Sequence, residues 1–398
     1  MQSRFFSYRN VDMSTLNIFI SAGDPSGERH AARLIDELKG MGVELTVTGI
    51  GGPAMEKAGA RLFCTQDRLA VMGLVEVLAH LKFFSRLLAG IRKHLQQQKP
   101  DLLVLIDFPD FNIRLARIAN KLGIPVLYYI SPQIWAWRTG RKRSLARLVD
   151  RMAVVFPFEV NFYRGENLDV EFVGHPLAGN LAAQYPRKEF CRLNSLDPDR
   201  PIVGLMPGSR AQELNRHFEI FLAAAEIMSN RRPDLQFAVA LLPHTAAALH
   251  GRDRRLLDKL GVRRIDSDSA SLIAHSRVLI TKSGTTTMEA ALLGTPMVIA
   301  YRTNPLSYWI VKRLVQVNYI GMPNLLASNP AIPELIQNQV QPGPLAQKAL
   351  DLLDESSPAR ERILEQFKQV RQALTTEKGA SRRVAEIVLE MCAQGRPE

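Results

Sequence analysis

The sequence predicts an α/β fold with two doubly wound parallel-sheet domains. Short apolar runs alternate with longer amphipathic stretches along the chain, and Gly, Pro or Asp bounds each run. Continuous apolar runs separated by helical segments are typical of parallel strands that helices cover on both faces. A chain of 398 residues also exceeds the size at which one hydrophobic core stops growing. We therefore expect two domains that face a central cleft, with ligands at the carboxyl ends of their strands.

The predicted strands fall into two series. The first contains LNIFISA from Leu16, ELTVTGI from Glu44, DLLVLID from Asp101, PVLYYIS from Pro125 and RMAVVF from Arg151. After a polar stretch from Gly179 to Pro201, the second contains IVGLMP, LQFAVALLP, VRRI, RVLITKS and TPMVIAYR. The series predict domains at 16–180 and 181–355, after a disordered extension at 1–15 in which Met13 is an alternative start. We expect residues 356–398 to form C-terminal helices that pack back across the domains.

The composition is that of an ordinary globular protein, with 46% hydrophobic and 23% charged residues. No stretch of about 18 apolar residues lacks charges, and the first residues contain no apolar core of signal-peptide length. We therefore expect a cytoplasmic protein. The three cysteines are scattered and the eight histidines show no paired spacing. Neither a disulfide framework nor a metal site is predicted, and no cofactor is expected.

The net charge of +12 indicates either an anionic partner or a role in solubility alone. Nucleic acid is the weaker choice of partner, because no RNA-binding signature, zinc-finger spacing or recognition helix accompanies the arginines. An anionic membrane surface and phosphorylated substrates remain open. Trp135 and Trp137 come just before a cationic cluster, and they are either core anchors or the edge of a substrate or membrane site. The cluster consists of Arg138, Arg141, Lys142, Arg143, Arg147 and Arg151.

The loop SAGDPSGE, from Ser21 to Glu28, lies between a predicted strand and a predicted helix. Gly23 and Gly27 let the backbone approach a ligand, and Ser26 lies where the helix begins, so that unpaired N–H groups there can bind an anion. A tight turn needs glycine even without a ligand, and the spacing is not that of a dinucleotide site. This loop alone fits a structural turn as well as a binding site.

The loop MPGSRAQEL, from Met206 to Leu214, repeats the order of strand, glycine turn and helix. Here Gly208 and Ser209 are followed by Arg210 at the start of the helix. Backbone N–H groups, a hydroxyl and a guanidinium that converge on one point suit a phosphate or a diphosphate. We therefore interpret this loop as the phosphate-binding loop of an enzyme that uses a sugar nucleotide.

The segment TKSGTTTMEAALLGTPMVI, from Thr281 to Ile299, contains a third strand-to-helix turn. Ser283, Gly284 and Thr285 place hydroxyls at the start of the helix. Glu289 is expected on the first turns, where its carboxylate could accept hydrogen bonds from two ribose hydroxyls. The alternative is that Glu289 only complements the helix dipole.

The segment LIDFPDFN, from Leu105 to Asn112, carries two carboxylates after a predicted strand. Asp107 ends the strand, and a carboxylate there could act as a general base on an acceptor hydroxyl. The competing interpretation is that one of the two caps the helix that starts near Phe111. For Asp110 we favour the cap.

The segment from Leu69 to Lys93 is unusually apolar, and its later half carries Lys82, Arg86, Arg92 and Lys93. Core helices account for many such stretches. An apolar face edged by basic residues is also typical of a segment that lies in an anionic membrane surface. Together with the cationic cluster and the net charge, the segment favours the membrane interpretation.

Taken together, these segments resemble the lipid-A-disaccharide synthase family of bacterial glycosyltransferases, which have the GT-B fold of two Rossmann-like domains. The matching stretches run in one order from about Ser21 to Ala327: AGDPSGE, LAVMGLVEVL, IDFPDFN, SPQIWAWR, FVGHPL, LMPGSR, KSGTTTMEA, MVIAYR through KRL, and MPNLLA. The resemblance implies an inverting, metal-independent transfer from UDP-2,3-diacylglucosamine to 2,3-diacylglucosamine 1-phosphate, which gives the β-1′,6-linked disaccharide phosphate and UDP. It also implies a peripheral location on the cytoplasmic face of the inner membrane, and a homodimer is compatible with it.

Carried over by motif, the resemblance makes Asp107 the base, with Ser26 also in the site. It places Arg210, Glu289 and Asn324 on the UDP side, together with the turn residues Gly208, Ser209, Ser283, Gly284 and Thr285. His175 of FVGHP matches the family between the two domains. One departure is visible, because many members have GEASGD where this chain has GDPSGE, with the lengths of the two acids exchanged. The resemblance therefore supports a family role for Ser26 and Gly27 more than for Asp24 or Glu28.

Two other classes of function stay open beside this one. One is another UDP-sugar enzyme of envelope synthesis with the same fold, such as an N-acetylglucosamine transferase acting on a lipid-linked peptidoglycan precursor, or a sugar-nucleotide epimerase. The other is a non-catalytic protein that binds anionic lipid. Turnover that depends on acylated sugars separates the first class from the family, and release of UDP excludes the second.

Overall fold

A computed structural model describes residues 15–66, 77–137, 139–179, 181–241, 249, 251–266, 268–315 and 317–394. The chain divides into two units, one of residues 1–176 with 376–398 and one of residues 177–375. Most of the expected extension at 1–15 and the stretch 69–76 of the expected membrane segment lie outside the described residues.

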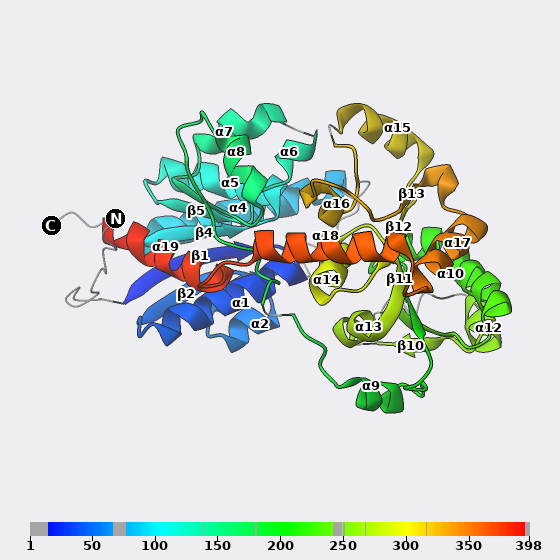
Figure 1. Cartoon of the computed structure of the whole chain (residues 1–398). Coiled ribbons are helices and arrows are strands. Elements are labelled where there is room, and N and C mark those ends of the chain that lie inside the picture. The colour runs from blue at the N-terminus through cyan, green and yellow to red at the C-terminus, as the bar shows by residue number, and fades with distance from the viewer. Residues whose placement is uncertain are drawn as a thin grey trace. The chain divides into compact units, whose positions relative to one another are not determined.

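The strands and helices of the first unit alternate along the chain (Figure 1). Its strands are β1 (Leu16–Ala22), β2 (Leu45–Gly51), β3 (Arg61–Thr65), β4 (Leu102–Ile106), β5 (Val126–Tyr129), β6 (Arg151–Val154) and β7 (Asp169–Phe172). Its helices are α1 (Pro25–Gly40), α2 (Pro53–Lys57), α4 (Val77–Gln98), α5 (Pro109–Lys121), α6 (Ile134–Trp137), η1 (Thr139–Arg141), α7 (Lys142–Ala146), α8 (Pro157–Tyr163) and α19 (Ala380–Gln394).

The second unit alternates in the same way. Its strands are β8 (Ile202–Met206), β9 (Gln236–Ala240), β10 (Arg263–Ile265), β11 (Ser276–Lys282), β12 (Met297–Tyr301) and β13 (Glu334–Ile336). Its helices are α9 (Arg187–Leu193), α10 (Ala211–Arg231), α12 (Gly251–Lys259), α13 (Ser269–His275), α14 (Thr285–Leu293), α15 (Pro305–Leu314), α16 (Met322–Leu326), η2 (Gln337–Gln339), α17 (Pro342–Leu353) and α18 (Pro358–Leu374).

Both sheets are parallel and doubly wound, as the apolar runs predict. The strand order is β3-β2-β1-β4-β5-β6-β7 in the first unit and β10-β9-β8-β11-β12-β13 in the second. In each sheet the order reverses once, between β1 and β4 and between β8 and β11. Ligands of such sheets bind at this switch point, outside the carboxyl ends of the strands. The topology therefore singles out the loops after β1, β4, β8 and β11.

The strands of the first unit are apolar on both faces, so helices cover the sheet on both sides. One part of the core lies between the sheet and the helices α4 and α5. One set of alternating strand residues, which includes Phe19, Leu103 and Tyr128, packs with Ile91 of α4 and Leu115 of α5. The other face is covered by α1 and α19, which pack against each other. Since α19 comes from the end of the chain, residues of the C-terminus complete the first unit.

A network of ion pairs holds α19 against the strands of the first unit. Arg383 of α19 pairs with Glu171 of β7 and, at 2.7 Å, with Glu390. Arg151 of β6 pairs with Glu171 at 2.7 Å and with Glu390 at 2.5 Å. Two arginines thus share two carboxylates from different elements, and the side chains are half-buried. Removal of one partner leaves charges without compensation in a partly desolvated place.

In the second unit, α17 packs on α10 and on the strands β11 and β12, whereas α13 and α14 cover the opposite face of the sheet. α18 packs on α14, α16 and α17. Ile363, Phe367, Val370 and Leu374 of α18 are buried. The helices at residues 356–398 thus belong to different units, with α18 in the second and α19 in the first.

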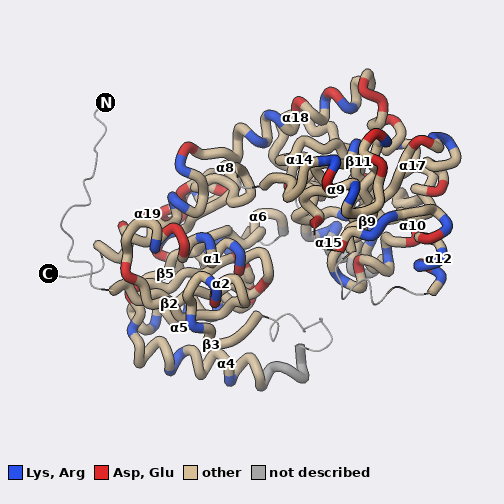
Figure 2. Tube along the Cα trace, turned by 90° about the horizontal axis from the view of Figure 1, so that it is seen from below, with Lys and Arg blue, Asp and Glu red and all other residues tan. Residues whose placement is uncertain are grey.

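The described part of the apolar segment 69–93 belongs to α4. Its aromatic and aliphatic residues from Phe83 onward pack against the core of the first unit. Arg86, Arg92 and Lys93 are exposed, and Figure 2 shows Lys and Arg but no Asp or Glu along this helix. Among the described residues, no helix is both long and apolar enough to span a bilayer.

We expect Arg383→Met to loosen α19 by removing one of the two shared cations. The loss should be about 1–3 kcal/mol of unfolding free energy, since the remaining carboxylates stay partly buried. Urea unfolding and hydrogen exchange of the α19 amides measure it. The control Lys368→Met removes an exposed pair with Glu365 on α18 and should cost less than about 0.5 kcal/mol. Equal losses for the two variants would contradict a specific role of the network.

Candidate functional site

At the switch point of the first unit, the backbone turns sharply after β4. Asp107 and Phe108 adopt left-handed φ angles of 44° and 49°, a conformation that costs about 1–3 kcal/mol for such residues. Asn112 of α5, which is fully buried, holds the turn. Its Nδ2 donates to the carbonyl oxygens of Asp107 at 2.7 Å and Ile106 at 3.2 Å, and its Oδ1 accepts from the Ser21 hydroxyl at 2.7 Å. One side chain thus joins the ends of β1 and β4.

The carboxyl group of Asp107 is the perturbed acid of this turn. Burial raises its pKa from the ordinary value to about 6, and the negative charge of Asp24 adds to the rise, against a hydrogen bond from the Phe108 N–H. Asp107 is therefore ionised at neutral pH and holds a proton more tightly than an exposed aspartate. These are the properties of a general base.

Asp110 does not cap the helix as we expected. The helix begins at Pro109 with Phe108 as the N-cap residue, and no side chain caps it. Asp110 instead lies within the first turn, where a carboxylate complements the helix dipole, and it pairs with Arg141 at 3.5 Å.

The loop after β1 lies directly against this turn. A Cβ atom on Gly23 would come within 2.3 Å of the Phe108 ring, so only glycine fits there. Asp24 caps α1 by accepting from the Gly27 N–H at 2.6 Å, and the buried Glu28 accepts from the Ala54 N–H at 2.5 Å. Asp24 and Glu28, the two acids that depart from the family's motif, thus both accept hydrogen bonds from backbone N–H groups.

Ser26 lies on the first turn of α1, half-buried, and its Oγ is 3.4 Å from Nε2 of His30. Burial, together with the nearby charge of Arg33, lowers the pKa of His30 to about 3, so the imidazole is neutral. A neutral partner leaves the Ser26 hydroxyl able to accept or donate. The structure therefore brings Ser26, Asp24 and Asp107 to one end of the first sheet.

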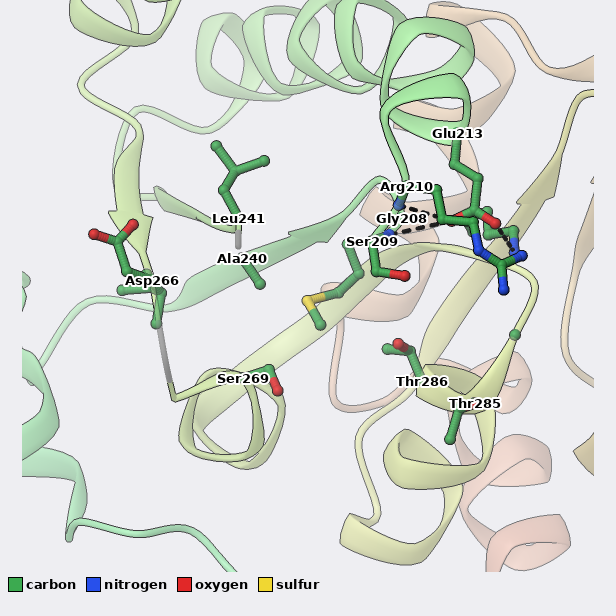
Figure 3. A pocket seen from close by; sticks show the side chains of 14 residues that line it. Gly208, Ser209, Arg210, Glu213, Ala240, Leu241, Asp266, Ser269, Thr285 and Thr286 are labelled. Atoms are coloured by element: carbon green, nitrogen blue, oxygen red, sulfur yellow. Dashed lines mark hydrogen bonds and ion pairs between the residues drawn. The ribbon is translucent and has the colours of Figure 1, made fainter. Parts of the chain in front are cut away.

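At the switch point of the second unit, a cavity of about 360 Å³ opens between the loops after β8 and β11 (Figure 3). Five of the predicted donor-side residues line it: Gly208, Ser209, Arg210, Gly284 and Thr285. The rest of the lining is mixed: apolar Met206, Ala240, Leu241 and Ile265, the hydroxyls of Ser269 and Thr286, and the charged side chains of Glu213, Asp266 and Lys282. The cavity thus offers two cations, several hydroxyls and apolar side chains, together with the carboxylates of Glu213 and Asp266.

The glycine loop is arranged differently from our expectation that its N–H groups face the ligand. The Glu213 carboxylate accepts from the N–H of Ser209 at 3.1 Å and of Arg210 at 3.4 Å, as the dashed lines in Figure 3 show. Lys282, at the end of β11, pairs with the same carboxylate at 2.9 Å. Burial raises the pKa of Glu213, but the hydrogen bond and charge of Lys282 outweigh burial, so its pKa lies below the ordinary value. Arg210 and Lys282 are the cationic side chains among the residues that line the cavity.

The other three predicted residues do not line this cavity. Ser283 donates through its hydroxyl to the Ile320 carbonyl at 2.7 Å. Asn324 is buried, with Nδ2 donating at 2.8 Å to Glu334, which in turn accepts from the N–H groups of Ile320 and Gly321. Ser283 and Asn324 thus support one backbone segment. Glu289 is half-buried beyond the first turn of α14, so dipole complementation does not explain it. Their contacts with a donor stay predictions.

The described residues of the cationic cluster do not all have free charges on one surface. Arg151 belongs to the ion-pair network of α19, and Lys142 pairs with Glu166 at 3.5 Å. Arg143 and Arg147 are exposed, and Arg138 lies outside the described residues. Trp135 is a core anchor, since its indole is buried and donates to Glu159 at 3.2 Å. The side chain of Trp137 lies outside the description.

Comparisons with known proteins identify the family of the chain. The sequence model of the family described as lipid-A-disaccharide synthetase matches residues 18–388. The chain belongs to this family. A lipid-A-disaccharide synthase of Geobacter sulfurreducens is 44% identical over 376 residues, which cover 94% of this chain and 97% of the relative. Another, from Coxiella burnetii, is 38% identical and covers 86% of this chain and 90% of the relative.

Solved structures with low identity support the fold of this lipid-A-disaccharide synthetase family member. A putative UDP-N-acetylglucosamine 2-epimerase from Listeria monocytogenes superposes with a TM-score of 0.64 at 15% identity, covering 97% of this chain and 99% of the other. The glycotransferase of kitacinnamycin gives a TM-score of 0.62 at 16% identity, covering 95% and 99%. At these identities the likeness concerns the GT-B fold alone.

Three residues of this family member that matter for the site escaped the sequence analysis: Asn112, Glu213 and Lys282. Each lies inside a motif that was recognised, as the last residue of LIDFPDFN, the Glu of MPGSRAQEL and the Lys of TKSGTTT. Polar residues near the junction of a strand and the following helix were the available signal. Their partners come from other elements, so only the structure shows what they hold.

We expect Asn112→Ala to destabilise the first unit by about 2–4 kcal/mol, because buried carbonyl groups and the Ser21 hydroxyl lose their partner. Urea unfolding measures the loss. The matched control is Asn120→Ala at the far end of α5, whose side chain is exposed and which should stay within about 0.5 kcal/mol of the parent. An Asn112→Ala variant as stable as the control would show that the turn after β4 does not depend on this amide.

Proposed function

We propose that this chain is a lipid-A-disaccharide synthase that transfers 2,3-diacylglucosamine from UDP to the 6-hydroxyl of 2,3-diacylglucosamine 1-phosphate. Two observations carry the proposal: the switch point of the first unit presents a half-buried carboxylate with a raised pKa, and that of the second unit has a cavity of about 360 Å³ whose lining includes Arg210 and Lys282. Membership of the family names the substrates. The products are the β-1′,6-linked disaccharide phosphate and UDP.

The reaction is a single displacement with inversion. Oxygen O6 of the acceptor attacks the anomeric carbon, the bond from that carbon to the diphosphate breaks, and its electron pair leaves with UDP. The acceptor proton passes to Asp107, whose raised pKa lets it bind this proton as the new bond forms. Arg210 and Lys282 line the cavity and stabilise the negative charge that grows on the departing diphosphate.

We also propose that the enzyme works on the cytoplasmic face of the inner membrane, as a peripheral protein with an anionic lipid surface as partner. Both substrates carry acyl chains, and α4 presents Arg86, Arg92 and Lys93 to solvent without an acidic residue on the same helix. Attraction to anionic lipid contributes about 1 kcal/mol for each such cation near the surface.

The base assignment predicts that turnover of the parent enzyme falls as the pH drops below about 6, because protonated Asp107 cannot accept the acceptor proton.

Asp107→Asn should lower kcat by about 10²–10⁴ while UDP still binds, since the donor cavity is unchanged. Asparagine tolerates the left-handed backbone at this position. Its neutral amide also removes the charge whose burial is unfavourable, so the variant should unfold at a higher urea concentration than the parent at pH 8.

The control for the base is Asp110→Asn, which changes the second carboxylate of the same motif on an exposed side chain. This variant should keep near-normal turnover. Mass spectrometry of the products from both acylated sugars gives the readout. Near-normal turnover of Asp107→Asn would contradict the base assignment. A donor without acyl chains that reacts equally well would favour another UDP-sugar enzyme.

The donor assignment predicts that Arg210→Met weakens the binding of UDP by about tenfold or more, since a charge-assisted hydrogen bond to phosphate is lost. Isothermal titration calorimetry measures this affinity. Arg252→Met is the control, because Arg252 belongs to the same unit, has a side chain 80% exposed and lies outside the cavity. UDP affinities that fall alike in both variants would indicate a general charge effect and contradict a phosphate contact.

A further inference from the structure

Helix α15 (Pro305–Leu314) of the second unit presents an indole ring to solvent. Trp309 is 54% exposed, more than Phe63, Leu193 or Tyr319, the other large hydrophobic side chains that stand out on the surface of the described residues. A single exposed apolar residue needs no explanation. The neighbours of Trp309 decide whether this one has a function.

Each aromatic ring on the described face of α15 has a cation one helical turn later. The guanidinium carbon of Arg313 lies 3.7 Å from the centre of the Trp309 ring, and Nζ of Lys312 lies 6.0 Å from the centre of the Tyr308 ring. Residues four apart in a helix share one side. The helix therefore carries two cation–aromatic pairs, and Trp309, Lys312 and Arg313 are exposed.

The positive charge of this region has no compensation. No Asp or Glu occurs between Glu289 and Glu334 in the sequence. In the described part of the chain, the exposed cations Lys312 and Arg313 form no ion pair.

The contrast with α10 and α12 of the same unit is clear. There Arg252 pairs with Glu219 and Lys259 with Glu226. Because α15 lacks such partners, its cations are available to an anionic partner.

We propose that α15 is a membrane-contact helix of the second unit, with the phosphate groups of anionic phospholipids as its ligands. Tryptophan and tyrosine favour the boundary between water and the acyl chains, where a ring meets lipid and its polar atom stays hydrated. Lys312 and Arg313 lie on the same side as the rings and bind the lipid phosphates. This inference rests on the proposed function, which brings the enzyme to a membrane, and it adds a contact that α4 of the first unit does not supply.

The full-length protein is tested by co-sedimentation with phosphatidylethanolamine vesicles that contain or lack phosphatidylglycerol. Lys312→Ala/Arg313→Ala should weaken binding to the anionic vesicles by about tenfold or more, at roughly 1 kcal/mol for each cation. The control Arg252→Ala/Lys259→Ala removes the same number of cations from the same unit, but ones that face carboxylates. It should bind almost as the parent does. A Lys312→Ala/Arg313→Ala variant that binds like the control overturns the proposal.

A second readout follows the indole itself. Brominated phospholipid in the vesicles should quench the fluorescence of the parent more than that of Trp309→Phe, because only the parent places an indole of α15 in the lipid. Equal quenching of the two overturns the proposal.

Turnover in detergent micelles separates this inference from the function on which it rests. The parent and the α15 variants should be equally active there, since both substrates are dispersed without a bilayer. A raised KM for the acylated donor with unchanged vesicle binding would make α15 a substrate contact and overturn the membrane role. Binding of a single-stranded oligonucleotide that the double variant loses, without any vesicle binding, would do the same. No turnover by the parent would instead contradict the proposed enzyme and leave the vesicle result to stand by itself.

Discussion

The hydrogen bonds of the buried Asn112 amide are the constraint on which the first site depends. Two neighbouring parallel strands, β1 and β4, end at this point, and their last carbonyl groups have no further strand to bind. Asn112 satisfies the carbonyls of Ile106 and Asp107 and accepts from Ser21. Because a buried polar group without a partner costs about 1–3 kcal/mol, these bonds stabilise the left-handed turn at Asp107. In the second unit a charged side chain stabilises the corresponding loop. The Glu213 carboxylate accepts hydrogen bonds from two N–H groups of the loop after β8.

The central strands of both sheets could be predicted from the sequence, whereas three edge strands could not. Strands β1, β4, β8 and β11 are apolar on both faces and appear as continuous runs. The missed strands, β3, β7 and β13, each form an edge of a sheet. The pattern of β3 is largely exposed, and β7 contains charged residues. Half of such a strand faces solvent or a neighbouring loop, so its composition resembles that of a loop, and its pairing depends on a partner distant in sequence.

Among the candidate site residues, the sequence pointed to those expected to approach a ligand from a loop more readily than to those that support the loop. The turns between a strand and the following helix pointed to Ser26, Asp107 and Arg210, because a strand, a turn and a helix in succession leave few places for polar residues. Glu213 and Lys282 were not predicted as site residues, because their ion pair joins positions far apart in the chain. Arg151 and Glu390 are also far apart in the chain, so their ion pair could not be predicted from the sequence. This pair means that Arg151 does not contribute a free charge to the cationic cluster. A charge in the sequence carries no information on its partner.

The strain at the turn after β4 bears on the proposed role of Asp107 as the base. Ile130, at the end of the adjacent strand β5, also has a left-handed φ of 67°, which is rare for a β-branched residue. Strained backbone at two neighbouring strand ends persists only where the surroundings over-determine it. Here the surroundings are Asn112 and the Tyr128 hydroxyl, which donates to the Asp107 carbonyl at 2.7 Å. Both contacts fix the backbone of Asp107 and leave its carboxylate unneutralised. In the proposed mechanism, folding energy is thus used to hold a half-buried carboxylate in one position, which lowers the reorganisation needed when an acceptor hydroxyl arrives.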